Sequence, residues 1–141
     1  MTVLLDDHLL RVWLGGADDA LRVAIGGEPV ATTNLWYLRL CKGMASYRGV
    51  ALANWPDRER RALIAGLVAL PERVTVVPMR ELAWQIGELR AGHAGLSTLG
   101  AEAVASGLVL DARVLVSSRN VGPGIQRCCE AVGLRHDIVP R

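Results

Sequence analysis

The last third of the chain, Gly100 to Pro140, reads GAEAVASGLVLDARVLVSSRNVGPGIQRCCEAVGLRHDIVP and decides the fold class. Its beginning, Ala101–Ala105, predicts a helix with an acid near its start, and the run Arg113–Ser117 predicts a β-strand. A polar loop, a second helix and a short strand at Asp137–Val139 follow. Because open α/β sheets place their chemistry at the carboxyl ends of strands, this pattern is typical of one half of an α/β site.

The beginning of the chain supplies the other half of the predicted site. Val3–Leu5 reads as a buried strand, and the two carboxylates Asp6 and Asp7 follow it directly. Both ends of the chain therefore predict polar groups at carboxyl ends of strands, and we expect them to meet at one acidic cleft.

Short apolar runs and helical patterns alternate through the rest of the chain. This alternation predicts an α/β fold with a mostly parallel central sheet and helices on both faces. Thr32 or Thr33 can cap a helix that runs to about Met44, and Leu35, Leu38 and Cys41 share one stripe of that helix. Further strands are expected at 30–31 and 74–77, further helices at 9–14, 58–70 and 79–89, and 17–27 is ambiguous.

Composition limits the function classes. The 141 residues fit one domain, 1–141, and 51% hydrophobic residues exclude a disordered chain. The longest apolar run, Ala62–Leu70, is far short of the roughly 18 residues that a membrane span needs. With no signal peptide or span in the sequence, we expect a cytoplasmic protein. The net charge of +2 does not by itself indicate nucleic-acid binding, and the three cysteines are expected to be reduced thiols.

Five short phrases carry a resemblance to a known family. Their order and spacing resemble the PIN-domain family of small nucleases, which includes the toxin endoribonucleases of bacterial toxin–antitoxin pairs. The likeness covers nearly the whole chain. The phrases are Leu4-Leu5-Asp6, Ala31-Thr32-Thr33, Val77-Pro78-Met79, Leu96-Ser97 before Ala101–Ala105, and Val114–Ser117.

The resemblance implies a metal-dependent endoribonuclease that cleaves RNA. The family's chemistry needs three or four carboxylates around Mg²⁺ or Mn²⁺, because these hard cations select carboxylate oxygens and can activate water for attack on a phosphate. By position, Asp6 and Glu102 match two of these acids, so they are the expected catalytic residues and metal ligands. Asp7, directly after Asp6, is expected as a further metal ligand, and the alternative is that it is a solvated strand end.

Two acidic positions of the family have no acid here. The glutamate of the second family helix falls at about Leu38 or Arg39, and the last acid falls within Ser118-Arg119-Asn120. The resemblance therefore implies an incomplete acidic site. We expect Arg39, Ser118, Arg119 and Asn120 to contact substrate instead.

Alternative interpretations of the two acids stay open. A buried Asp6 is costly without a partner, and its partner could be a metal, a helix N-terminus, or Arg119 or Arg39. Glu102 could bind metal or interact with the dipole of its own helix from the first turn. The protein is thus either a ribonuclease or a catalytically depleted module that binds RNA or a protein partner, such as an antitoxin-like protein. A homodimer is expected in either case.

Overall fold

The computed structural model describes residues 1–16, 18–45 and 56–141. The strands in these ranges are β1 (Val3–Leu5), β2 (Val30–Thr32), β3 (Thr75–Val76), β4 (Arg113–Ser117) and β5 (His136–Val139). They form one five-stranded parallel sheet in the order β3-β2-β1-β4-β5. The helices are α1 (Asp7–Gly15), α2 (Asp19–Ile25), α3 (Asn34–Ala45), α5 (Asp57–Val68), α6 (Leu70–Arg73), α7 (Met79–Gly92), α8 (Thr98–Leu110) and α9 (Pro123–Val132). The predicted fold class is confirmed.

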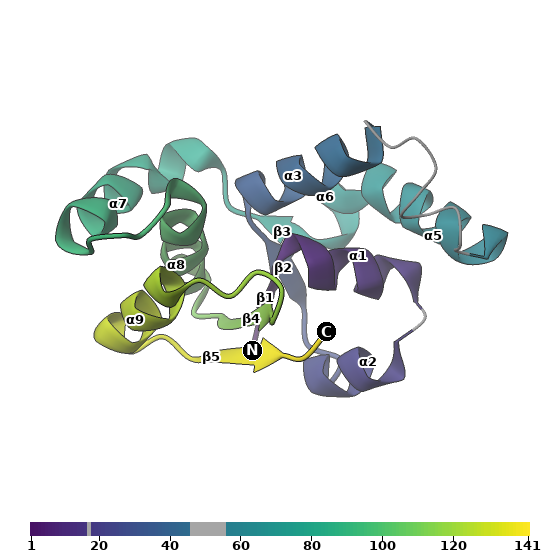
Figure 1. The fold of residues 1–141 in the computed structure, drawn as a ribbon. Coiled ribbons are helices and arrows are strands. Elements are labelled where there is room, and N and C mark those ends of the chain that lie inside the picture. Colours follow the sequence, from purple (N-terminus) through teal and green to yellow (C-terminus); the bar gives the residue numbers. More distant parts are fainter. Residues whose placement is uncertain (17, 46–55) are drawn as a thin grey trace.

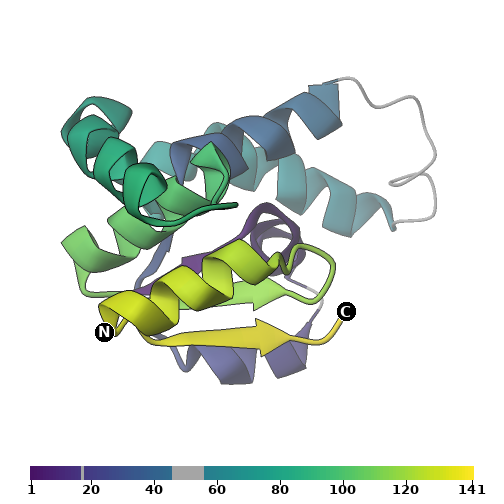
Figure 2. The ribbon, with the colours of Figure 1, turned by 60° about the vertical axis from the view of Figure 1, so that its left-hand side comes forward.

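Helices cover both faces of the sheet. In Figure 1, α7, α8 and α9 lie on one side of the strands, and α1 and α2 lie on the other. Figure 2 shows α9 running alongside β5. Alternate side chains of β1 divide between two cores: Leu4 packs in the core beside α7 and α8, while Val3 and Leu5 pack in the core beside α1 and α5. This alternation follows from the two-residue period of a strand.

The helix α3 buries a different stripe from the one predicted. Its buried side chains are Trp36 and Leu40, which are 0% and 6% exposed, whereas Leu38 is 61% exposed. Residues four apart lie on one helix face, so burying Trp36 and Leu40 turns Leu38 outward. Thr33 rather than Thr32 caps the helix, because its Oγ1 accepts the Trp36 N–H at 3.0 Å.

Two other sequence expectations are refined. The ambiguous segment contains α2, which Asp18 caps by accepting the Leu21 N–H at 2.8 Å. The expected helix over 58–70 is two helices, α5 and α6. The three cysteines are free thiols, as predicted. Among the residues described, no helix has both the length and the apolar composition that a bilayer-spanning segment needs.

Candidate functional site

Asp6 lies at the centre of the sheet, between the end of β1 and the start of α1. Its side chain is fully buried. Oδ1 accepts the Leu9 N–H at 2.8 Å, so Asp6 is the N-cap of α1. Oδ2 accepts two further hydrogen bonds, from the Ser117 N–H at 2.7 Å and from Asn120 Nδ2 at 2.8 Å. Of the partners considered for Asp6, the structure shows the helix N-terminus, together with the end of β4.

Asp7 pairs with Arg39 on the exposed side of Asp6. Arg39 donates from Nε to Asp7 Oδ2 at 2.7 Å and from Nη2 to Oδ1 at 2.6 Å, which is a bidentate pair. The Asp7 carboxylate raises the pKa of the Arg39 guanidinium. The alternative in which Arg39 or Arg119 bonds directly to Asp6 is wrong, because the Asp6 oxygens accept from Leu9, Ser117 and Asn120 instead. α3 and α1 are in contact here, and Asp7 is partly exposed at the start of α1 while Asp6 is buried behind it. The Arg39 guanidinium therefore pairs with Asp7.

Asn120 joins the two acids and the arginine into one network. Its Nδ2 donates to Asp6 Oδ2 and to Asp7 Oδ1, both at 2.8 Å, and its Oδ1 accepts from Arg39 Nη2 at 2.8 Å. An amide suits this position because it can donate to carboxylates and accept from a guanidinium at once. A carboxylate at residue 120 could accept from the guanidinium but could not donate to Asp6 and Asp7.

The two neighbours of Asn120 have different surroundings. Ser118 Oγ accepts the Arg141 N–H at 2.9 Å and donates to the Arg141 carbonyl at 3.2 Å. The Arg119 N–H donates to Ser117 Oγ at 3.2 Å, and the Arg119 side chain is exposed. Burial lowers the pKa of His8, and the positive charges of Arg11, Arg119 and Arg141 lower it further.

Glu102 binds the beginning of a different helix. It is fully buried on α8, whose N-cap is Ser97, so it lies beyond the first turn and not within it as expected. Oε1 accepts the Leu35 N–H at 2.8 Å, and Oε2 accepts the Asn34 N–H at 2.9 Å and Asn34 Nδ2 at 2.6 Å. Glu102 therefore satisfies orphan donors at the N-terminus of α3. The dipole it stabilises belongs to α3, since its own helix begins four residues earlier at Thr98.

Ser117 is the site residue that the sequence did not identify. Its backbone N–H, rather than its hydroxyl, holds Asp6. The parallel register pairs Leu5 with Leu115, which brings the end of β4 beside Asp6. Backbone groups leave no signature in a sequence, so only the strand pairing could have found this contact.

The carboxylates of Asp6, Asp7 and Glu102, as they are bonded in this structure, do not fit Mg²⁺ or Mn²⁺. Each carboxylate oxygen of Asp6, Asp7 and Glu102 accepts at least one N–H from the protein. A hard cation would compete with these N–H groups for the carboxylate oxygens, and Arg39 adds a fixed positive charge beside Asp7. Within residues 1–16, 18–45 and 56–141, no three His, Cys, Asp or Glu side chains gather as a group that could hold a metal ion.

Comparison with known proteins identifies the fold. No protein-family model matches the chain, and no curated protein matches it. Two solved structures are similar. One is VapBC2 from Rickettsia felis bound to a DNA fragment from their promoter, with 12% identity and a TM-score of 0.61 over 99% of each chain. The other is FitAB bound to an IR36 DNA fragment, with 12% identity and a TM-score of 0.62 over 96% of this chain and 94% of that chain. The chain has a PIN-like fold, which it shares with these two structures.

Replacing Glu102 by glutamine tests its role at the start of α3. The variant keeps the shape but turns one acceptor into a donor, so at least one buried N–H loses its partner. We expect Glu102→Gln to lower the free energy of unfolding in urea by about 1–3 kcal/mol. The control Glu130→Gln changes an exposed glutamate of α9 and should stay within about 0.5 kcal/mol of wild type. An unchanged or higher free energy of unfolding for Glu102→Gln would contradict this role. It would show that the buried carboxylate does not stabilise the fold, as is expected of a residue kept for ligand binding.

The protonation of Asp6 predicts a pH dependence of stability. Burial raises the pKa of Asp6 above its usual 3.8, although hydrogen bonds from Leu9, Asn120 and Ser117 oppose this. The folded state then binds the proton more tightly than the unfolded chain does. The contribution of Asp6 to the free energy of unfolding is therefore greatest at low pH and falls as pH rises from 3.8 to the folded pKa.

The stability difference between wild type and Asp6→Asn isolates that contribution. We expect the difference to decrease with rising pH across the acidic range and then to become constant. Asp19→Asn, whose side chain is 92% exposed in wild type, should show no such decrease. A difference that grows with pH would mean that the hydrogen bonds outweigh burial and lower the pKa of Asp6.

Proposed function

We propose that this protein is a non-catalytic PIN-like module that acts by binding a partner protein. The observation that carries the proposal is the bidentate Arg39–Asp7 pair, which Asn120 connects to Asp6. A guanidinium stays protonated at all physiological pH values, so a change of pH within that range does not remove the positive charge of Arg39 from Asp7. It neutralises the carboxylate that would otherwise attract a cation.

Phosphodiester cleavage by this fold would need what the network lacks. A resident metal ion would supply a hydroxide nucleophile and neutralise charge on the phosphate. Arg39 can neutralise charge, but it cannot lower the pKa of a water as a divalent ion does. The side chains that remain, Arg39, Ser118, Arg119 and Asn120, can hold and orient an anion.

An antitoxin-like protein is the proposed partner class. The similarity to VapBC2 and FitAB supports this, since both are complexes and the likeness extends over almost the whole chain. We extend the proposal to a homodimer, which exposed apolar side chains on several helices support. They are Val23, Leu38, Ile64, Val68, Trp84 and Val109.

A slow Mg²⁺- or Mn²⁺-dependent ribonuclease is the second candidate. The position of Asp6 at the carboxyl end of the central parallel strand favours it. In that case Asp6, Asp7 and Glu102 would have to release their present donors. Arg39, Ser118, Arg119 and Asn120 would then contact RNA.

Restoring acids at the two vacant positions separates the candidates. The double variant Arg39→Glu/Asn120→Asp removes the ion pair and supplies two carboxylates. If the scaffold is a depleted nuclease, this variant should cleave RNA in Mn²⁺ about a hundredfold faster than wild type, as expected for a regained electrostatic stabiliser. The matched control Arg39→Gln/Asn120→Leu breaks the same network without adding acids and should stay inactive.

Cleavage by the wild-type protein would contradict the proposal. The decisive pattern is robust RNA cleavage that disappears in Asp6→Asn while the variant remains folded by circular dichroism. That result would make the second candidate correct. Lack of cleavage by every variant, with each still folded, would leave binding as the only role of this site.

A further inference from the structure

Basic side chains gather beside the Asp6 network, at the carboxyl ends of three neighbouring strands. His8 and Arg11 lie on α1, which follows β1. Arg119 lies in the loop after β4, and Arg141 follows β5. Because β1, β4 and β5 are adjacent and parallel, their carboxyl ends meet at one edge of the sheet.

The position of Arg119 is fixed by its two neighbours in the loop. Ser118 Oγ accepts the Arg141 N–H at 2.9 Å, and Asn120 Nδ2 donates to Asp7 Oδ1 at 2.8 Å. The backbone of Arg119 therefore lies between the segment after β5 and the start of α1. Its side chain is exposed, so a ligand can reach it.

His8 and Arg11 provide donors on the α1 side of this loop. Arg11 Nη2 lies 3.0 Å from His8 Nδ1. A guanidinium can only donate, so Nδ1 accepts, and in the neutral imidazole the proton is on Nε2. Burial lowers the pKa of Arg11, and the positive charge of Arg119 lowers it further. Like charges placed in this way repel each other, and an anion bound between them would relieve the repulsion.

The acids near this cluster are matched by other arginines. Asp7 pairs with Arg39, and Asp18 pairs with the Arg141 guanidinium. Within the described part of the chain, no ion pair includes Arg119. Arginines outnumber acids here, so the net charge is positive: the arginines are Arg11, Arg39, Arg119 and Arg141, and the acids are Asp6, Asp7 and Asp18.

We propose that Arg119, Arg11 and His8 bind one phosphate group, either as free phosphate or as the terminal phosphate of a small phosphomonoester. Guanidinium groups match phosphate oxygens bidentately, and the imidazole N–H adds a further donor. A phosphomonoester offers three terminal acceptor oxygens and a charge of about −1.5 to −2 at pH 7. Such a group can contact all three side chains at once, whereas a carboxylate has fewer acceptors and a single charge. This site goes beyond the proposed function and does not depend on it.

Titration with inorganic phosphate tests the site. The ¹⁵N-labelled full-length protein is kept at constant ionic strength in a phosphate-free buffer, and NMR follows the His8 ring and the amides of Arg119 and Asn120. We expect these signals to shift and to saturate at millimolar phosphate, whereas chloride at the same ionic strength should have no such effect. Arg119→Gln should weaken the affinity about tenfold or more, because a charge-assisted bond is lost. His8→Phe, which removes the imidazole donor, should weaken it as well.

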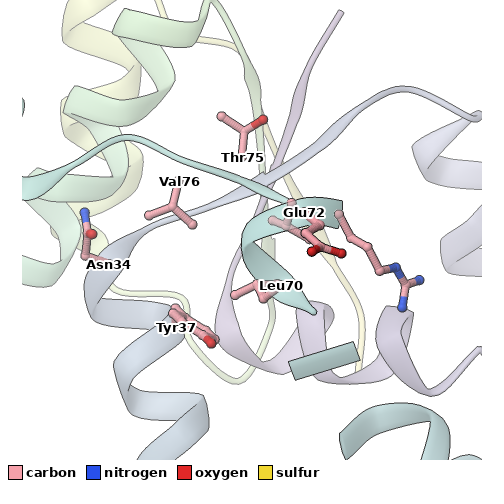
Figure 3. Close-up of a pocket in the computed structure, with 8 residues that line it drawn as sticks. Asn34, Tyr37, Leu70, Glu72, Thr75 and Val76 are labelled. Atoms are coloured by element: carbon pink, nitrogen blue, oxygen red, sulfur yellow. The ribbon is translucent and has the colours of Figure 1, made fainter. Parts of the chain in front are cut away.

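Arg73 provides the matched control. It is also an exposed arginine, and it lines a pocket of about 500 Å³ between α3, α6 and β3, where Glu72 lies beside it (Figure 3). Arg73→Gln should leave the phosphate affinity unchanged. Shifts that do not saturate, or an equal loss of affinity in Arg73→Gln and Arg119→Gln, would overturn the proposal, because they would indicate non-specific attraction of phosphate to arginine.

Two further ligands identify the source of the phosphate. Tighter binding of ribose 5-phosphate than of inorganic phosphate would assign the site to a phosphomonoester, and equal or weaker binding would assign it to free phosphate. Single-stranded RNA with a 5′-hydroxyl is the opposing case. If it displaces phosphate from these residues and binds more tightly than both small ligands, the cluster belongs to an RNA path and the proposal is wrong. These measurements involve no partner protein and no cleavage, so their failure is distinct from failure of the proposed function.

Discussion

The structure depends on one buried carboxylate, that of Asp6, and on the three N–H groups that satisfy it. A buried charge without hydrogen bonds would destabilise the fold by several kcal/mol. The donors come from α1, from the end of β4 and from the loop after β4. Satisfying Asp6 therefore fixes the start of α1 against the carboxyl ends of two adjacent parallel strands. It also places Asn120 where it can bridge to Asp7.

Glu102 plays the corresponding part for α3. Three donors from Asn34 and Leu35 converge on its carboxylate, and Asn34 Nδ2 also donates to the Val77 carbonyl at 2.7 Å. These contacts join α3 to α8 and to the segment after β3. Arg39 lies just over one turn along α3, so Glu102 contributes to the position from which Arg39 reaches Asp7. Both buried acids thus anchor helices, and through α3 one of them supports the ion pair that neutralises the surface of the site.

The sequence predicted the sheet well because strands of this kind leave a local signal. Val3–Leu5 and Arg113–Ser117 are short aliphatic runs between helical patterns, and a buried parallel strand requires such a run. The start of α3 was readable to within one residue, as Thr32 or Thr33, since capping residues act on neighbours a few positions away. The buried stripe of α3 could not be read from the sequence, because Leu38 and Leu40 are equally apolar and only tertiary packing decides which one faces the core.

The acidic site was predictable in its location and not in its bonding. Asp6 and Asn120 could be placed at adjacent strand ends from their positions after predicted strands. The partners of Glu102 lie 67 and 68 residues away, and those that hold Asp6 from the end of β4 and the loop after it lie 111 and 114 residues away. Contacts of such separation depend on strand order and register. The replacement of expected acids by Arg39 and Asn120 was visible in the sequence, but the bidentate pair with Asp7 required the structure.

Paramagnetic broadening by Mn²⁺ most directly tests whether Arg39 holds the place that a cation would take. The reporters are the amide resonances of Leu9, Leu35 and Ser117, whose N–H groups donate to the carboxylates in question. With millimolar Mn²⁺ added to the wild-type protein, these resonances should broaden no more than those of exposed amides elsewhere. Arg39→Gln provides the comparison in which the guanidinium is absent. Selective loss of the Leu9 and Ser117 signals in the wild type would contradict the account, because it would place the ion at Asp6 with Arg39 present.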